Sequence, residues 1–413
     1  KKSTGYLLLV CFYLVVCISY AQPQAPELFS DINVIPPSPT AASITKFVDY
    51  PVSYYTGAPQ VSTPIYTIKT QQLEVPVSLS YHVTGLKVEE IASWVGAGWT
   101  LNAGGVITRS VKGLPDEYLN DPRKGYYHNR NVILANGSIN GGALNDCSVT
   151  NAITSESPVN TPDSVSWGLL DTEPDVYALS APGIDDKFFI GKTGEIVHYA
   201  SSDLKYELYP FSNPSAIPTH TGPDYVWEVR GTDGKLYKFS SRERTITSST
   251  CNGSRSMYDS PVDYQSSWYL DEISIGDEWI RFEYAAETLT YPVTISESSK
   301  LKVHGNDANT INSTCYNDNT VQSKRLSRIY SSNGYEILFE VDPVATRNDL
   351  NGSKKLNKAV VKFNNVFVTA FVFDHSYFGT NTKLKLNKVV QVDAYNNPVN
   401  QGQQFEYFSF GAF

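Results

Sequence analysis

The residues best suited to chemistry are scattered along this chain rather than grouped. The six histidines are isolated from one another, so none has a second histidine at the spacing of a metal site, and HExxH is absent. They are His82, His128, His198, His220, His304 and His375. The chain also lacks a GxSxG elbow, a phosphate-binding loop and a complete dinucleotide fingerprint. These patterns predict no catalytic residue, no metal ligand and no cofactor.

Adjacent carboxylates are the next candidates, at Glu89-Glu90, Asp116-Glu117 and Asp185-Asp186. Glycoside hydrolysis needs two carboxylates that face each other across the sugar bond. Neighbouring residues of a strand point to opposite faces, so an adjacent pair does not supply that geometry by itself. Because such acids are common on protein surfaces, we interpret all three pairs as solvated loop charges.

Two features leave ligand binding open. The run Asp349–Gly352 resembles half of a calcium loop, but Lys354 and Lys355 follow where a distal acid is needed. Trp94 and Trp99 could form an aromatic surface for a sugar. Large rings beside glycines more often fill a core or a sheet junction, so we expect Trp99 to be buried and structural.

The N-terminus has the form of a signal peptide. Lys1-Lys2 precede an apolar run, Tyr6–Ile18, and a small-x-small site ends at Ala21. That run is shorter than the about 20 residues that a spanning helix needs. We therefore expect cleavage near Ala21, export by secretion machinery, a secreted or outer-surface location and no stable membrane insertion.

Cysteine usage agrees with export but does not fix a pairing. Once Cys11 and Cys17 leave with the signal peptide, Cys147, Cys251 and Cys315 remain. The last two both lie in stretches rich in Ser, Thr and Asn, and an exported compartment permits a disulfide between them. A Cys251–Cys315 disulfide and three free thiols both stay open.

Composition predicts an all-β fold with few helices. The chain has 28 Tyr and 18 Phe against one Met, and aromatic and β-branched residues favour strands. Its net charge of −9 argues against a nucleic-acid partner, which would need clustered Lys and Arg.

Alternating and polar stretches predict where strands and loops fall. Val75, Val77, Leu79 and Tyr81 form one apolar face of a strand. Asp233-Gly234 joins two alternating runs as a hairpin. Residues 241–266 and 298–323 are polar and are expected to be loops, and Val88–Ser93 is expected to hold at most one helical turn.

A glycine-rich motif with two tryptophans lies between the first predicted strands. Four glycines within ten residues predict a compact turn, because glycine allows positive φ and close backbone approach. Its structural residues are Trp94, Gly96, Gly98, Trp99, Leu101, Gly105 and Arg109.

The last third contains a weak strand–turn–strand repeat. Aromatic residues two apart on each second strand should line one side of a continuous sheet that later hairpins cover. They are Phe282 and Tyr284, Phe339, and Phe405 and Tyr407. The resulting organisation is a signal peptide (1–21), a Pro-rich leader (22–46), an N-terminal β region with the glycine motif (47–118), a β region with long polar loops (119–265), and hairpin repeats (266–413) expected to continue beyond this sequence.

The string Glu74–Tyr81, then Gly98–Asn102, then Gly105–Arg109 resembles the opening of RHS/YD-repeat proteins of Bacteroidetes-type bacteria. It is distantly similar to the B component of insecticidal toxin complexes. The resemblance implies successive antiparallel hairpins that form an extended or rolled sheet. It also implies a non-enzymatic shell of the polymorphic-toxin kind, whose partners are the downstream repeats and a C-terminal effector of the same polypeptide. Full YD repeats and an autoproteolytic motif are not visible in the sequence.

Two alternatives follow from the residues alone. The Tyr and Trp content suits a cell-surface adhesive or carbohydrate-binding module. Export and the number of carboxylates leave a secreted glycoside hydrolase as a lesser alternative.

Overall fold

Strands provide almost all the regular structure in the computed structural model. It describes residues 60–82, 90–120, 123–127, 171, 173–191, 194–209, 226–251, 261–304, 307–343, 346–379 and 382–407. All of them lie in the compact unit Val52–Phe413. Within these residues helical geometry occurs only at Tyr126 and Tyr127, so the predicted all-β class is confirmed. None of the described segments forms an apolar helix long enough to cross a membrane.

The first strands are β1 (Gln60–Lys69), β2 (Glu74–His82), β3 (Trp99–Asn102), β4 (Val106–Ser110), β5 (Leu119–Asn120), β6 (Arg123–Lys124), β7 (Val176–Ala181), β8 (Ile184–Ile190), β9 (Ile196–His198), β10 (Lys205–Tyr209) and β11 (Val226–Arg230). After them come β12 (Leu236–Cys251), β13 (Val262–Ile275), β14 (Glu278–Thr290), β15 (Thr294–His304), β16 (Asp307–Ser331), β17 (Tyr335–Val341), β18 (Leu356–Phe363), β19 (Val366–Phe378), β20 (Lys383–Val392) and β21 (Gln403–Gln404).

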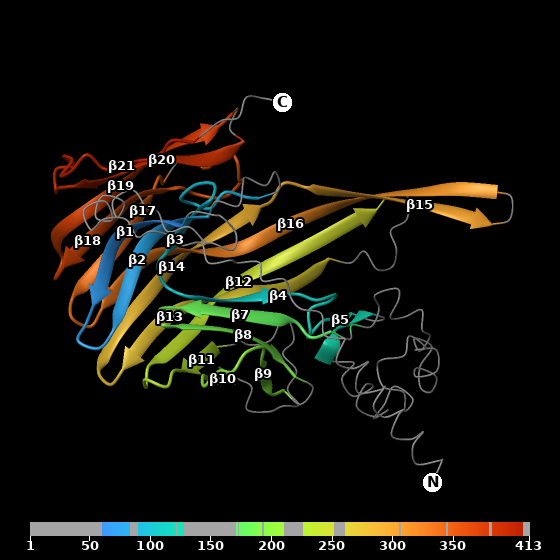
Figure 1. Cartoon of the computed structure of the whole chain (residues 1–413), viewed down its shortest axis with the longest axis horizontal. Helices are drawn as coiled ribbons and strands as arrows, with labels where there is room; N and C mark the ends of the chain where they lie inside the picture. The colour runs from blue at the N-terminus through green and yellow to red at the C-terminus, as the bar shows by residue number, and fades with distance from the viewer. Residues whose placement is uncertain are drawn as a thin grey trace, which may run out of the picture. The chain divides into compact units, whose positions relative to one another are not determined.

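One antiparallel sheet of 16 strands dominates the described residues (Figure 1). Its main path runs β21-β20-β19-β18-β17-β16-β12-β13-β4-β7-β8-β9, and strands of all three predicted β regions take part. A separate sheet, β1-β2-β3, packs on it, and β5-β6 form a small ribbon. The predicted hairpin at Asp233-Gly234 is present between β11 and β12.

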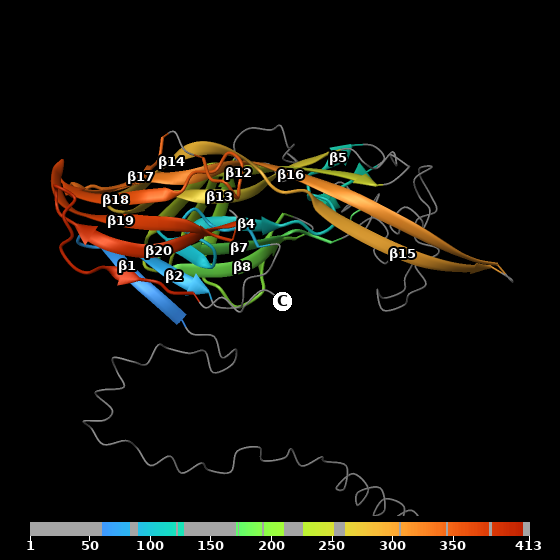
Figure 2. The same cartoon turned by 90° about the horizontal axis from the view of Figure 1, so that it is seen from above.

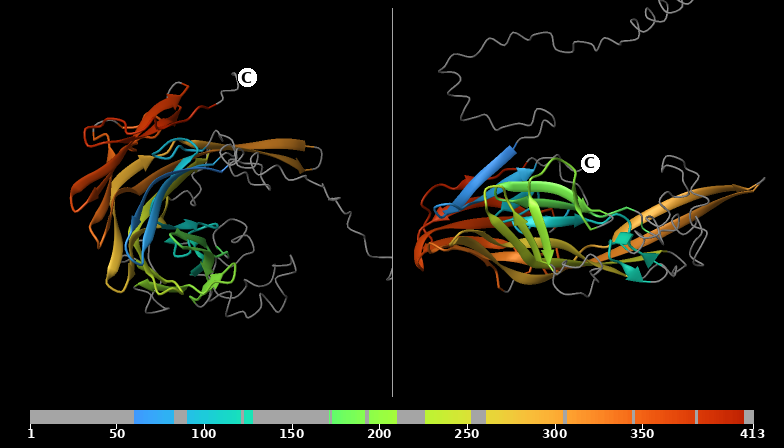
Figure 3. Two further views of the ribbon diagram at one scale, coloured as in Figure 1. Left: turned by 60° about the vertical axis from the view of Figure 1, so that its left-hand side comes forward. Right: turned by 90° about the horizontal axis from the view of Figure 1, so that it is seen from below.

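The half of the large sheet that contains β7 to β13 is curled (Figure 3, left, green to yellow), and its buried residues include an aromatic cluster. The rings of Tyr177, Phe188, Trp227 and Trp268 lie within 6 Å of a neighbour in the cluster. Tyr206 of β10 donates a hydrogen bond to Oδ2 of Asp186 on β8 (2.7 Å), although those two strands are not paired. Side chains therefore link β8 to β10 around the cluster.

The other half of the sheet has one apolar face. Phe282 pairs with Ile329, which pairs with Ile337, which pairs with Val361, and all four side chains are buried in one core. Phe339, two residues beyond Ile337, lies on the same face, as the sequence predicts.

Two details of that repeat are corrected. Phe405 and Tyr407 follow the short strand β21 instead of forming part of it. The apolar face is covered by the N-terminal residues, not by later hairpins: Tyr66 of β1 meets Tyr335, and Trp94 meets Phe339. The N-terminal sheet supplies an apolar face of its own through β2, where Val75, Val77 and Leu79 are buried.

The prediction of polar loops at 241–266 and 298–323 is wrong for most of those residues. β12 extends to Cys251, β13 begins at Val262, and β15 and β16 together cover nearly all of 294–331. Arg244–Thr247 of β12 is bonded to β13 on one side and to β16 on the other. The backbone N–H and C=O groups there form hydrogen bonds with strands from distant parts of the sequence. A strand can therefore form there even though its side chains are polar and give it no apolar face.

Beyond the pairing of β16 with β12, strands β15 and β16 form a two-stranded ribbon that extends from the sheet (Figures 1 and 2). At its base Ile295 and Tyr316 face each other across the strands, and both are exposed. The next pair is Ser296 and Cys315, so the predicted cysteine lies where the ribbon leaves the sheet.

Candidate functional site

The glycine motif forms a connecting segment between the two sheets. We call residues 90–105 the glycine segment. Gly96 has φ of +130°, and a Cβ placed there would lie 2.9 Å from the backbone N of Leu386 on β20. Gly98 has φ of +75°, and a Cβ there would lie 2.6 Å from the Tyr81 ring. Glycine at these positions lets the segment dock against β20 on one side and β2 on the other.

Backbone hydrogen bonds tie the segment to the C-terminal strands. The N–H of Leu356 on β18 donates to the carbonyl of Trp94 (2.9 Å), and the N–H of Ala97 donates to that of Leu384 on β20 (2.8 Å). The segment therefore acts as a connection between strands far apart in the sequence.

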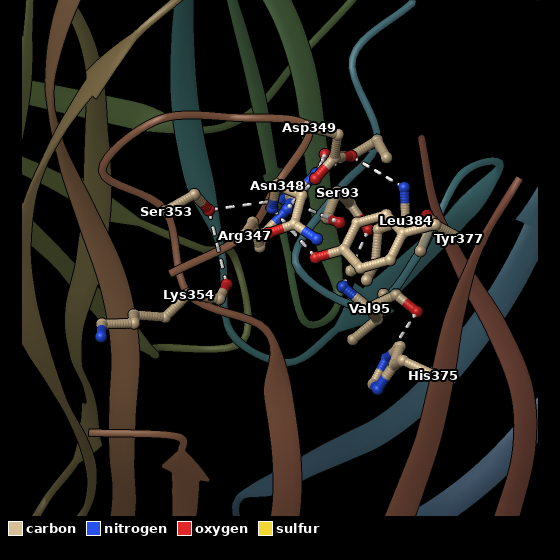
Figure 4. Close-up of polar contacts among 12 residues, drawn as sticks. Ser93, Val95, Arg347, Asn348, Asp349, Ser353, Lys354, His375, Tyr377 and Leu384 are labelled. Atoms are coloured by element: carbon tan, nitrogen blue, oxygen red, sulfur yellow. Dashed lines mark hydrogen bonds and ion pairs between the residues drawn. The ribbon is translucent and has the colours of Figure 1, made fainter. Parts of the chain in front are cut away.

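A buried arginine completes this docking (Figure 4). Nη2 and Nη1 of Arg347 donate to the carbonyls of Ala92 (2.9 Å) and Ser93 (3.0 Å). The same guanidinium forms a two-point ion pair with Asp349, whose Oδ2 also accepts the N–H of Leu384 (2.8 Å). We call Arg347 and Asp349 the clasp. Because Asp349 is engaged by a guanidinium, it does not fit the calcium-loop alternative.

His375 makes a further contact with the segment. Its Nε2 lies 3.2 Å from the Val95 carbonyl, so the neutral ring donates a hydrogen bond there. Burial lowers the pKa of His375 to about 4. Its other nitrogen, Nδ1, is buried without a hydrogen-bond partner. Because the ring is neutral at ordinary pH, we interpret it as a hydrogen-bond donor to the backbone and not as a group that transfers protons.

The two tryptophans lie in different surroundings. Trp99 is buried, as the sequence predicts; its Nε1 donates to the Tyr407 hydroxyl (2.7 Å), and its ring lies 4.3 Å from that of Phe405. Trp94 is only partly buried, and Leu101 packs against the same core. The aromatic residues of the last predicted repeat thus contact the glycine motif.

Arg109, the last motif residue, lies in a buried ionic cluster. It donates two hydrogen bonds to Glu117 (2.9 and 2.5 Å) and one to Asp175 (2.7 Å). Asp116 exchanges backbone–carboxylate hydrogen bonds with Asp175 (3.0 and 3.1 Å) and is 0% exposed. We call Arg109, Asp116, Glu117, Asp171 and Asp175 the acidic cluster. The prediction that Asp116-Glu117 is solvated is therefore wrong.

Protonation is unusual in the acidic cluster. Burial and, after it, the negative charge of Asp175 raise the pKa of Asp116 to about 8. Burial also raises the pKa of Asp171 to about 6 and that of Asp175 above its ordinary value. Oδ2 of Asp116 is buried without a hydrogen-bond partner. The three buried carboxylates of Asp116, Glu117 and Asp175 share one guanidinium and cannot all stay charged at low energetic cost, so Asp116 holds its proton near neutral pH.

The remaining candidates are separated from one another. The Asp185-Asp186 interpretation is also wrong for Asp186, whose side chain is only 3% exposed and whose Oδ2 lies 2.7 Å from Nδ1 of His198. Glu90 is exposed, whereas Glu89, His128 and His220 lie outside the described residues, as do the signal peptide and Cys147. In the described part of the chain no three His, Cys, Asp or Glu residues are placed to hold a metal ion.

Cys315 is disulfide-bonded. Cys251 is its register partner between β12 and β16. This placement suits a Cys251–Cys315 disulfide, which stays a prediction.

A cleft of about 730 Å³ opens beside the glycine segment. We call it the Trp94 cleft. Trp94, Leu101 and Gly105 line it together with residues of β14 and β16. A Cβ on Gly105 would lie 2.6 Å from that of Ala181, so glycine permits the close approach to β7 here. Several of the predicted motif residues therefore line this one cleft.

No sequence pattern predicts the ion pair of the clasp. Arg347 donates to carbonyls 254 and 255 residues earlier, and the neighbouring run Asp349–Gly352 resembles only half of a calcium loop. No protein-family model, curated protein or solved structure matches this chain.

Proposed function

We propose that this chain is a non-enzymatic structural scaffold of an exported shell protein of RHS/YD-repeat type, which encloses or presents an effector carried by the same polypeptide. The observation that carries the proposal is the docking of the glycine segment. Its glycines, the clasp and His375 hold backbone carbonyls and connect the N-terminal sheet to β18 and β20. Charged groups that are costly to bury are thus used to hold the sheet together.

The experiment is limited proteolysis of the whole natural gene product that contains this chain. If the chain is a scaffold, residues 60–407 should resist the protease as one unit. A separate effector region should then be recovered intact together with that unit. Prompt cleavage within the described strands, or an effector region digested as fast as when expressed alone, would contradict the proposal.

A surface-binding module is the second candidate, and the Trp94 cleft favours it. An aromatic side chain on the wall of a cleft of this size is typical of small-ligand sites. A glycan array with the exported chain separates the two functions, because a pure scaffold predicts no saturable glycan binding.

A further inference from the structure

Three hydroxyl groups on the wall of the Trp94 cleft have their protons engaged within the protein. Tyr269 and Ser323 line the cleft, and both donate to Oε2 of Glu243 (2.9 and 2.6 Å). Tyr284 also lines it and donates to a backbone carbonyl of β13 (2.6 Å). Each hydroxyl has a single proton, so these three oxygens have only lone pairs left to offer. This part of the wall therefore favours a ligand that brings hydrogen-bond donors.

A carboxylate without a cation lies behind two of those hydroxyls. Glu243 of β12 is partly buried, and its Oε1 accepts the Ser266 hydroxyl (3.0 Å). Within the described part of the chain, hydroxyl groups are its side-chain partners and no ion pair engages it. Neutral donors do not cancel its charge, and an opposite charge nearby would stabilise the charged form.

The negative charge of Glu243 acts on the lining of the cleft. Burial and, after it, the charge of Glu243 raise the pKa of Tyr291, which lines the cleft. The same two causes, in the same order, raise the pKa of Tyr269. The field of the carboxylate is therefore felt by two tyrosines of the wall, and a cation placed beside them would be attracted.

The arginines of the wall are already matched. Arg347 is paired with Asp349 (2.7 Å), and Arg325 is paired with Glu287 (2.5 Å). Each of these pairs is neutral as a whole. Glu243 therefore leaves one unmatched negative charge beside the cleft.

Lys324 is the remaining charged residue of the lining, and it does not supply the missing cation. It alternates with Ser323 and Arg325 along β16, and its register partner on β14 is the exposed Ala286. Successive residues of a strand point to opposite faces, so the side chain of Lys324 leaves the strand on the face opposite Ser323.

Aromatic and apolar residues complete the site. The rings of Tyr269 and Tyr284 lie 5.3 Å apart, and Tyr291 is a third tyrosine of the lining. Leu101 and Leu289 add apolar surface. Aromatic rings attract an ammonium group, and apolar side chains suit an alkyl chain attached to it.

We propose that the Trp94 cleft binds a primary ammonium group on an apolar chain, with the ammonium donating to the hydroxyl oxygens of Tyr269 and Ser323 and the chain against the apolar lining. A free alkylamine and a lysine side chain of a protein partner both have this chemistry. The proposal does not depend on the scaffold function, because the cleft lies beside the docked segment whatever that segment supports.

Calorimetry with the full chain tests it. The main probe is hexylammonium; hexanol keeps the alkyl chain without the charge, and hexyltrimethylammonium keeps the charge without N–H donors. We expect saturable binding of hexylammonium and about tenfold weaker binding of both comparison compounds, since each loses the charge-assisted hydrogen bonds. N-acetyl-lysine methylamide represents the lysine source, and whichever of it and hexylammonium binds more tightly identifies the source.

Glu243→Gln removes the charge and keeps an oxygen that can accept hydrogen bonds. It should weaken hexylammonium binding by about tenfold and leave hexanol binding unchanged. Glu340→Gln, at an exposed position of β17, is the matched control and should bind as wild type does. Thermal melting checks that each variant is folded, and the comparison of probes on the wild type stands whether or not Glu243→Gln folds.

Equal affinity for hexylammonium and hexanol, equal behaviour of the Glu243 and Glu340 variants, or tighter binding of hexyltrimethylammonium or hexanoate than of hexylammonium would each overturn the proposal. So would the absence of saturable hexylammonium binding at millimolar concentrations.

Discussion

At the scale of single residues, Asp116 shows what a sequence pattern cannot reveal. Adjacent acids are normally solvated, and nothing around Asp116-Glu117 indicates otherwise. Their partners are Arg109 and the distant Asp175, which is 66 residues from Arg109. The burial of Trp99 was predictable because the neighbouring glycines are a local signal, whereas an ionic cluster whose members lie far apart in the sequence has none.

Asp116 should make stability depend on pH. Its folded-state pKa, about 8, lies above the ordinary 3.8, so the folded state binds the proton more tightly. That contribution is complete below about pH 4 and is lost as the pH rises through about 8. Urea unfolding of wild type and Asp116→Asn should show wild type losing free energy of unfolding relative to the variant between pH 5 and pH 9.

Asp393 provides a control of opposite sign. Hydrogen bonds from the Asn397 side chain and backbone lower its pKa, so its contribution is present at neutral pH and is lost on acidification. Asp393→Asn should alter the pH dependence only in acid. Identical slopes for wild type and Asp116→Asn from pH 5 to pH 9 would show that the buried proton is absent.

Trp99 should contribute strongly to stability. It fills the junction between β2, Phe405 and Tyr407, and Trp99→Ala should lower the free energy of unfolding by about 3–5 kcal/mol. Tyr395→Ala, at a side chain that is 86% exposed, should have little effect. Denaturant unfolding measures both. A Trp99→Ala variant that unfolds like wild type but loses a ligand would instead support a binding role for this ring.

At the scale of elements, strands with a regular apolar face were predictable and polar strands were not. The alternation in β2 and the Asp-Gly turn between β11 and β12 are local signals. β12 and β16 have long polar stretches whose strand conformation depends on neighbours from other parts of the chain. Sequence periodicity cannot supply that information, because backbone pairing leaves no pattern in polar side chains.

Gly96→Ala should damage the docking more than an ordinary turn substitution. Gly276→Ala is the matched control, because Gly276 also has positive φ (+57°) but open space around its Cβ position. The control should cost about 1–3 kcal/mol from backbone strain. Gly96→Ala adds a clash with the backbone of Leu386 and should cost more, as measured by urea unfolding. Equal costs would mean that the close approach to β20 is unimportant.

The base of the β15–β16 ribbon should be crosslinked. Because Cys315 is disulfide-bonded and Cys251 is opposite it in the register, non-reducing peptide mapping should recover a peptide that joins the two. Removing the bond by Cys251→Ser should cost about 2–5 kcal/mol. A crosslink between Cys315 and Cys147 would refute this pairing.

At the scale of the whole molecule, the resemblance predicted a sheet of hairpins but not how its parts are joined. The clasp connects residues about 255 positions apart, and it accompanies Trp99–Tyr407 and Leu356–Trp94 contacts of similar span. Contacts of this kind are set by the folded backbone, so no window of sequence can contain them. We therefore expect the N-terminal sheet to depend on β17–β20 for its stability.

Native-state hydrogen exchange tests this dependence most directly. If the glycine segment joins both sheets into one cooperative structure, amides of β2 and of β18 should exchange with the same opening free energy and the same dependence on denaturant. The double variant Arg347→Gln, Asp349→Asn should let β1–β3 open separately at lower free energy while β18–β20 stay protected. Separate opening of β1–β3 in the wild type, or unchanged exchange in the double variant, would contradict the claim that the clasp and the glycine segment hold the scaffold together.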